Sequence, residues 1–396
     1  MRILFINNRF PPYHVGGSGI SCLRVAESLS KKHDVFILTS SYGLKKKTAD
    51  ANVFRLLHYL SINEKNLFLK RITQLKSAFL ARDNYSITGK LIKKLKPDVV
   101  NIGQMDDLSL FPVLAVQESK VPFTFSLNNY WPMYARQYFL EGQKSFRWYI
   151  RTKLLGEDIF PKLKFNPMSA QTRVFKDEYV KAGFKPDTIT VVGAGLNHEE
   201  LNAGPKKDLS NKVRLLCCGR IVEEKGIDIA IEAVAYLVKV LKFSKVSLDI
   251  IGIGEPRYIR SLKDLVSSLS MEEFVHFKDI IPNEMMMRLY QDYDILLFPF
   301  RWVEPLGLTV IEAMAKGVIV IATNKGGPSE LISDRQTGLL VSSEAPRDFA
   351  LKIEELIKNP ELVESIRSKA LDLVRRNYTV DSFVPRIEAF FEKAIA

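Results

Sequence analysis

A chain of 396 residues is long enough to form two domains, each with its own hydrophobic core. Apolar residues make up 46% of it, which is usual for a globular protein, and no apolar run approaches the roughly 18 residues of a membrane-spanning helix. The first residues enter a strand without an apolar signal region, so we expect a cytoplasmic protein. Cys22, Cys217 and Cys218 lack metal or redox spacing, and adjacent Cys217 and Cys218 should point to opposite faces of a strand.

The net charge of +12 lies in the first half of the chain. Residues 1–200 hold 30 Lys and Arg against 17 Asp and Glu (+13), which leaves 27 against 28 (−1) for residues 201–396. This asymmetry indicates an anionic partner such as a phospholipid surface or a lipid-phosphate acceptor, although a merely solvated basic surface would look the same. The basic, amphipathic residues 65–96 suit a helix on an anionic membrane, and equally a helix packed on a sheet. No nucleic-acid-binding module is recognisable.

The first half alternates short apolar runs with helical spacing, which predicts a parallel α/β domain. The strand predicted over Arg2–Asn8 is followed by a loop with Gly16, Gly17 and Gly19 and then by a helix. Glycines at such a position let the backbone approach a ligand and leave amides free at the helix start. Further strands are predicted over residues 34–40, 97–102, 122–127, 166–169 and 190–195.

The polar residues 201–211 form a predicted linker to a second α/β domain. Its strands are predicted over residues 213–218, 247–252, 275–281, 295–298 and 318–322. Arg220 and Lys225 follow the first of these strands, and their five-residue spacing allows both to converge on a diphosphate. A solvated basic pair beside Glu223 and Glu224 is the plainer interpretation.

The segment from Asp294 to Gly327 carries the strongest functional signal. A helix predicted over residues 308–316 begins after a loop that holds Glu304, and Glu312 lies about two turns inside it. The amides of Leu306, Gly307 and Leu308 should be unpaired at the positive helix end, which is suited to an anion. Two carboxylates roughly 10–12 Å apart with an anion site between them suit an elongated ligand such as a nucleotide-sugar.

This segment, EPLGLTVIEAMAKG, resembles the retaining glycosyltransferases of family 4, in which two glutamates are separated by seven residues. GGPSE at residues 326–330 and TGLLV at 337–341 strengthen the resemblance. It implies the GT-B fold, with two Rossmann-like, doubly wound parallel-sheet domains facing across a cleft. Residues 1–200 would form the acceptor-side domain and 212–377 the nucleotide-sugar domain, with 378–396 crossing back as a C-terminal helix.

The resemblance also implies a role for each site residue. Glu312 should hold the ribose and Glu304 the sugar hydroxyls, while Arg220 and Lys225 stabilise the departing diphosphate. The resemblance also places Ile281 at the nucleotide, and Gly16, Gly17, Gly19 and Asn128 at the sugar and acceptor. Gly252 follows a predicted strand, where a glycine lets the backbone approach the nucleotide. Asn128 stands where the family commonly has histidine, and asparagine can donate and accept hydrogen bonds but cannot titrate.

We expect no cofactor other than the nucleotide-diphosphate sugar, which is a co-substrate. Asp292 and Asp294 form a DxD pair, yet they flank the start of a strand, and Arg220, Lys225 and the helix end can offset the diphosphate charge without a metal. Expected partners are the donor, a glycan, lipid-linked or small-molecule acceptor, and an anionic membrane surface, with no nucleic acid. Assembly of a lipid-linked glycan or cell-surface polysaccharide at the inner face of the membrane is the expected setting.

Two other functions remain open from the sequence. A catalytically inactive relative that serves as a binding subunit is motivated by Asn128. A nicotinamide-dependent oxidoreductase would use one Rossmann-like half, but the chain has no GxGxxG after the first strand and no acidic residue after the second.

Overall fold

The computed structural model describes residues 1–13, 16–60, 67–142, 157–204, 209, 211–342 and 344–396. The chain divides into two compact units, here called unit 1 and unit 2. Unit 1 comprises residues 1–171, 176–192 and 384–396, and unit 2 comprises residues 172–175 and 193–383.

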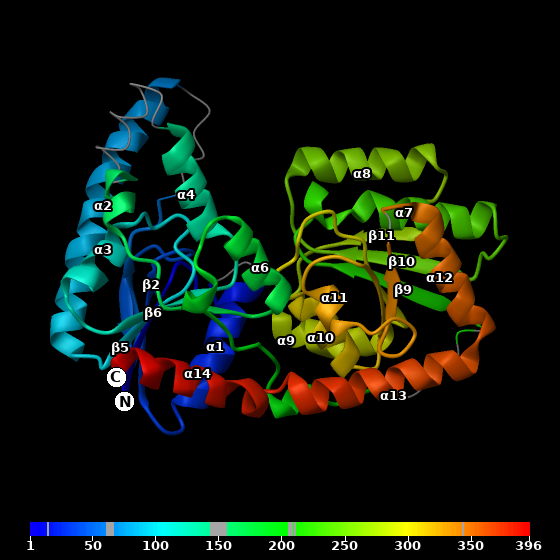
Figure 1. The fold of residues 1–396 in the computed structure, drawn as a ribbon. Coiled ribbons are helices and arrows are strands. Elements are labelled where there is room, and N and C mark those ends of the chain that lie inside the picture. The colour runs from blue at the N-terminus through cyan, green and yellow to red at the C-terminus, as the bar shows by residue number, and fades with distance from the viewer. Residues whose placement is uncertain (14–15, 61–66, 143–156, 205–208, 210, 343) are drawn as a thin grey trace. The chain divides into compact units, whose positions relative to one another are not determined.

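Unit 1 is built on an eight-stranded sheet with the order β3-β4-β2-β1-β5-β6-β7-β8 (Figure 1). All neighbours are parallel except the β3–β4 pair, which is antiparallel. Ile3, Leu4, Phe5 and Ile6 of β1 are each at most 4% exposed, because both faces of a central parallel strand are covered. The strands are β1 (Arg2–Asn7), β2 (Asp34–Ser40), β3 (Thr48–Asp50), β4 (Val53–Leu57), β5 (Val99–Ile102), β6 (Phe123–Leu127), β7 (Met168–Ala170) and β8 (Ile189–Val191).

The C-terminal segment of the chain completes unit 1. Phe391 is 1% exposed, and its ring centroid lies 6.0 Å from that of Phe5 on β1. Glu388 Oε1 lies 2.9 Å from His33 Nε2. The helices that carry unit 1 residues are α1 (Gly17–Leu29), α2 (Leu67–Leu95), α3 (Phe111–Glu118), α4 (Trp131–Gly142), α6 (Arg173–Lys181) and α14 (Val380–Ile395), with 3₁₀ turns at Glu157–Lys162 and Pro186–Thr188.

Unit 2 is built on a six-stranded, wholly parallel sheet with the order β11-β10-β9-β12-β13-β14. The strand order reverses direction between β9 and β12, where a doubly wound sheet opens a crevice at the carboxyl ends of its strands. The strands are β9 (Val213–Cys218), β10 (Val246–Ile251), β11 (Val275–Lys278), β12 (Ile295–Phe298), β13 (Ile319–Thr323) and β14 (Leu339–Val341).

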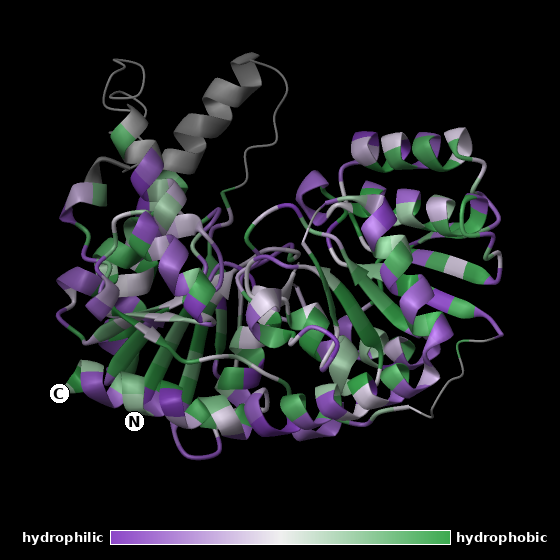
Figure 2. Ribbon diagram, turned by 45° about the vertical axis from the view of Figure 1, so that its right-hand side comes forward, coloured by the Kyte–Doolittle hydropathy of each residue, from purple (hydrophilic) through white to green (hydrophobic). Residues whose placement is uncertain are grey.

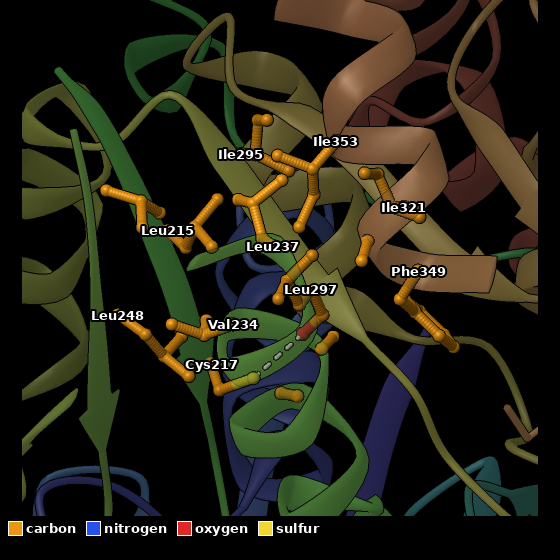
Figure 3. Packing of buried hydrophobic residues seen from close by; sticks show 14 of the residues in the cluster. Leu215, Cys217, Val234, Leu237, Leu248, Ile295, Leu297, Ile321, Phe349 and Ile353 are labelled. Atoms are coloured by element: carbon orange, nitrogen blue, oxygen red, sulfur yellow. Dashed lines mark hydrogen bonds between the residues drawn. The ribbon is translucent and has the colours of Figure 1, made fainter. Parts of the chain in front are cut away.

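Helices cover both faces of the unit 2 sheet. Figure 3 shows the core on one face, where side chains of β9, β10, β12 and β13 meet those of α7 and α12. The opposite core joins the sheet to α9, α10 and the end of α13. The helices are α7 (Ile227–Lys239), α8 (Pro256–Ser268), α9 (Asn283–Leu289), α10 (Leu308–Ala315), α11 (Pro328–Leu331), α12 (Pro346–Lys358) and α13 (Pro360–Asn377), with 3₁₀ turns at His198–Glu200, Glu223–Lys225 and Tyr290–Asp292.

The two adjacent cysteines of β9 confirm the predicted alternation of side chains across the sheet. Cys217 belongs to the first core, where its thiol donates to the carbonyl of Leu297 at 3.2 Å, whereas Cys218 packs against the second. Figure 2 shows that the strands are mostly hydrophobic, whereas the helices carry hydrophilic stripes.

The boundary between the units differs from the predicted domain end at residue 200. Residues 193–200 belong to unit 2, because Leu196 bridges to Thr379 and a side chain on Gly195 would lie 2.2 Å from the carbonyl oxygen of Tyr378. Residues 172–175 also belong to unit 2, where Thr172 Oγ1 donates to the carbonyl of Pro305 at 2.7 Å. Polar side-chain contacts of this kind leave no periodic signal in the sequence.

Some predicted features lie outside the described residues. These are the start of the basic segment 65–96, most of residues 141–165, and five positions of the predicted linker, 205–208 and 210. Within the described ranges, no helix combines the length and apolarity needed to cross a membrane.

Candidate active site

The predicted donor residues of unit 2 gather where β9 and β12 end. β9 leads into Gly219, Arg220 and the 3₁₀ turn Glu223–Lys225, while β12 leads through Pro299 into the loop that carries Glu304. β9 and β12 are neighbours in register, so their carboxyl ends open onto the same crevice.

Lys225 and Glu304 form an ion pair at this point. Lys225 Nζ lies 2.5 Å from Glu304 Oε2, and their side chains are only 17% and 14% exposed. The indole Nε1 of Trp302 donates to the same carboxylate oxygen at 2.9 Å, and the ammonium lies 5.2 Å and 5.5 Å from the ring centroids of Phe298 and Trp302. The sequence predicted separate roles for these two residues toward a ligand, whereas the structure shows that each is the other's partner.

Glycines hold the backbone beneath this ion pair. Gly226, directly after Lys225, has φ +61°, and a side chain there would lie 1.8 Å from the carbonyl oxygen of Pro299. Gly326 has φ +62°, and a side chain there would lie 2.6 Å from the backbone of Glu304. Gly327 donates its amide to the carbonyl of Glu304 at 2.6 Å. The GGPSE motif therefore supports the loop that carries Glu304.

Glu312 is 6% exposed and lies inside α10. The hydroxyl of Tyr290 donates to Glu312 Oε2 at 3.1 Å, and Asn283 Nδ2 lies 3.4 Å from Oε1. Burial is the main cause that raises the pKa of Tyr290 far above its ordinary value, so its hydroxyl keeps its proton. Neither partner was predicted, because a tyrosine among apolar residues is indistinguishable in the sequence from a core residue.

Helix α10 begins at Leu308 after Gly307, which has φ +87°. Pro305 lies outside the helix, because the left-handed Gly307 separates it from Leu308. Among the described residues, none accepts a hydrogen bond from the amides of Leu306, Gly307 or Leu308. These donors have the arrangement expected of an anion site at a helix start.

The other predicted donor contacts of unit 2 are Arg220, Ile281 and Gly252. Arg220 is exposed and makes no hydrogen bond or ion pair with any described residue. Ile281 packs against the second core, while its neighbour Ile280 is 56% exposed. Gly252 was expected to contact the ligand, but the structure gives another reason for a glycine there. A side chain would lie 1.8 Å from the carbonyl oxygen of Gly219.

In unit 1, the glycine loop leads into α1 as expected. Gly16 precedes the helix with φ +83°, and Gly17 and Gly19 lie in its first turn. A side chain on Gly16 would meet no atom within 4 Å, so its backbone angle, and not lack of space, favours glycine.

Asn128 lies partly buried just after β6, but the neighbouring Asn129 makes the polar contacts there. Asn129 Nδ2 donates to Asp106 Oδ2 at 2.5 Å, and Gln104 Nε2 donates to the same oxygen at 2.6 Å. Burial raises the pKa of the Asp106 carboxyl, while these two amide donors lower it. Asp106 follows β5 in the sequence GQMDD, and its position after a strand was the signal that could have revealed it.

The DxD pair and Glu304 lie at opposite ends of β12, because Asp292 and Asp294 precede the strand and Glu304 follows it. Asp294 is 2% exposed at the amino end of β12, and its Oδ2 accepts a hydrogen bond from the amide of Arg214 at 2.8 Å. It therefore joins β12 to β9. In the part of the chain that the structure describes, no group of three or more His, Cys, Asp or Glu side chains is arranged to hold a metal ion.

The two Rossmann-like parallel-sheet units have the GT-B fold, and two family models of glycosyltransferases match the chain, so we assign it to that class of enzyme. The family model described as "Glycosyl transferases group 1" matches residues 200–372, and that described as "Glycosyltransferase Family 4" matches residues 15–200.

Three similar proteins extend over most of the chain. An "Uncharacterized 42.6 kDa protein in cps region" of Klebsiella pneumoniae is 25% identical over 84% of this chain and 87% of its own. The "Uncharacterized glycosyltransferase MJ1607" of Methanocaldococcus jannaschii is 25% identical over 96% of this chain and 95% of its own. The crystal structure of Anabaena Alr3699/HepE in complex with UDP and glucose has a TM-score of 0.75 at 17% identity, covering 99% of each chain.

Proposed function

We propose that this glycosyltransferase moves a hexosyl or N-acetylhexosaminyl group from a nucleotide-diphosphate sugar to a hydroxyl acceptor, with retention of anomeric configuration. The observation that carries the proposal is the ion pair of Lys225 and Glu304, 2.5 Å apart at the strand switch, beside amides at the start of α10 for which no described residue is the acceptor. The complex of Anabaena Alr3699/HepE with UDP and glucose supports this class of donor.

In the proposed complex, Glu312 binds the ribose hydroxyls and Glu304 binds hydroxyls of the transferred sugar. Arg220, Lys225 and the amides from Leu306 to Leu308 stabilise the diphosphate as it departs. The base lies near Ile281. We propose that Arg220, Lys225 and the helix-start amides stabilise the diphosphate without a metal.

The proposed reaction takes place on one face of the sugar. The bond between the anomeric carbon and the phosphate oxygen breaks as the acceptor hydroxyl oxygen bonds to the same face of that carbon, which retains the configuration. The departing phosphate oxygen takes the hydroxyl proton. Asn128 and the loop of Gly16–Gly19 contact the sugar and acceptor, and no titrating residue at position 128 is needed because the phosphate is the base.

The basic excess of the first half of the chain supports an acceptor or membrane surface that carries negative charge. The Klebsiella relative is a protein of a cps region, which is consistent with a role in polysaccharide assembly. We therefore propose lipid-linked glycan or cell-surface polysaccharide assembly on the cytoplasmic side of a membrane, with a small soluble acceptor as the alternative.

The experiment is a thermal-stability panel of nucleoside diphosphates and nucleotide-sugars. A ligand that binds only the folded state adds about 2.7 kcal/mol at 100 times its Kd, so one nucleotide series should shift the melting transition selectively. Glu304→Ala should then retain the shift with the nucleoside diphosphate and lose donor turnover. Selective binding without any donor hydrolysis or transfer would instead support the inactive binding subunit, and no shift from any nucleotide would overturn the proposal.

A further inference from the structure

Arg301 joins the two loops that carry Lys225 and Glu304. Its guanidinium binds Asp228 in a two-pronged arrangement, with Nη1 2.7 Å from Oδ1 and Nη2 2.6 Å from Oδ2. Nη1 also donates to the carbonyl of Glu223 at 3.1 Å, and Nε lies 3.4 Å from Glu344 Oε2.

The backbone of Arg301 makes a second set of connections. Its amide donates to the carbonyl of Glu224 at 2.8 Å. Its carbonyl accepts a hydrogen bond from Lys325 Nζ, in the loop after β13. Backbone and side chain of one residue therefore contact three loops at the same edge of the unit 2 sheet.

These contacts converge on the turn that presents Lys225. Glu223 and Glu224 are the first two residues of the 3₁₀ turn that ends at Lys225, and Asp228 lies in the first turn of the following helix. Arg301 lies three residues before Glu304 in the other loop. The carbonyls of Glu223 and Glu224 are held directly by Arg301, so the position of Lys225 relative to Glu304 depends on this residue.

Arginine is suited to this task for a geometric reason. Its planar fork donates two parallel bonds to one carboxylate while a third bond reaches a carbonyl. A lysine would keep the charge but, as a point donor, could not hold the Asp228 carboxylate and the Glu223 carbonyl in fixed directions.

We propose that Arg301 is a positioning residue that sets Lys225 against Glu304, and thereby controls recognition of the diphosphate part of the donor. This inference rests on the proposed function, because Lys225 is there the diphosphate ligand. Arg301 acts through Lys225 and touches no part of the donor itself.

The test is a double-mutant cycle on nucleotide affinity. Isothermal titration measures the Kd of the nucleoside diphosphate that stabilises the protein most, and ligand-observed NMR measures binding of the corresponding nucleoside. Arg301→Lys should weaken diphosphate binding about tenfold, which corresponds to about 1.4 kcal/mol, and should change nucleoside binding less than about twofold, because Glu312 and its partners are untouched.

The decisive measurement uses the Lys225→Met background. There Arg301→Lys should change diphosphate affinity less than about twofold, because the residue through which it acts is absent. Asp228→Asn, which removes the other half of the clamp, should reproduce the selective loss and replaces Arg301→Lys if that variant fails to fold. Arg335→Lys is the matched control, since Arg335 Nη2 pairs with Glu355 Oε1 at 2.9 Å elsewhere in unit 2.

Three outcomes would overturn the inference. The first is additivity of the Arg301 and Lys225 substitutions, which indicates a general effect on stability. The second is equal loss of nucleoside and diphosphate binding. The third is that Arg301→Lys and Asp228→Asn leave diphosphate binding unchanged although Lys225→Met weakens it. This third outcome would leave the proposed function intact. If Lys225→Met itself has no effect, the diphosphate role of Lys225 fails and the inference fails with it.

Discussion

The hydroxyl of Tyr290 is the most direct place to test whether Glu312 is held in advance for a ribose. Tyr290 is 1% exposed, and its hydroxyl donates to Glu312 Oε2 at 3.1 Å and lies 3.5 Å from Cys218 Sγ. Tyr290→Phe removes one oxygen atom and leaves the ring in place. The variant therefore removes a hydrogen bond to a buried carboxylate. The space left by one oxygen atom is too small to lower the stability noticeably by itself.

The expected magnitude follows from that contact. A hydrogen bond to a charged group contributes about 1.5–3 kcal/mol, and the carboxylate that remains is short of one donor in a buried place. We expect unit 2 to lose about 2 kcal/mol, which lowers its melting temperature by about 4–8 °C for a unit of this size. Tyr236→Phe is the control, since that ring is partly buried in the same unit and no described residue accepts a hydrogen bond from its hydroxyl.

Calorimetry measures the loss of stability, and the transition of unit 2 is recognised because a nucleoside diphosphate shifts it. Binding measures the effect on function. Tyr290→Phe should weaken binding of the ribonucleoside diphosphate more than that of the 2′,3′-dideoxy analogue, because only the former has hydroxyls for Glu312 to bind. Equal losses with both ligands would refute the ribose role of Glu312. A melting temperature as high as that of Tyr236→Phe would refute the hydrogen-bond argument.

Three further predictions concern other positions. Glu304→Gln removes the negative charge that pairs with Lys225. We therefore expect calorimetry to show tighter binding of the nucleoside diphosphate, and turnover to fall about 100-fold. Weaker binding would contradict this. Burial raises the pKa of Asp106, so the folded state holds this proton to a higher pH than the unfolded chain and loses stability as pH rises through that range. Asp106→Asn should therefore raise the melting temperature at pH 7 and leave it unchanged below about pH 4, whereas a constant difference at every pH would point to another cause. Gly226→Ala should cost at least about 1–3 kcal/mol in urea unfolding, because φ is +61° and the new methyl would meet the carbonyl of Pro299, and a neutral result would contradict the described turn.

The sheets could be predicted from the sequence because their strands are buried on both faces. The runs at residues 213–218 and 295–298 are β9 and β12 with the predicted bounds. β3 and β4 were not predicted, since β3 has only three residues and Arg55 interrupts the apolar run of β4. Local periodicity thus identifies strands with a continuous apolar run and misses short or interrupted ones.

The contacts within the candidate site could not be predicted from the sequence. Glu304, Glu312 and Lys225 were named as site residues from the resemblance of their segments to glycosyltransferases of family 4. Charged side chains find partners through tertiary distances, which a sequence does not contain, so the contact of Lys225 with Glu304 could not be derived. Arg301 was missed for the same reason, since a single arginine in a loop is most often solvated.

The division of unit 1 into three chain segments has a consequence for biosynthesis. Synthesis runs from the N-terminus, so Phe5 and His33 are made before unit 2, whereas Phe391 and Glu388, which contact them, are made after it. All segments of unit 2 are present once residue 383 has been made. Unit 1 therefore lacks residues 384–396 until after unit 2 has been made. Until then, Phe391 does not cover its hydrophobic position against β1.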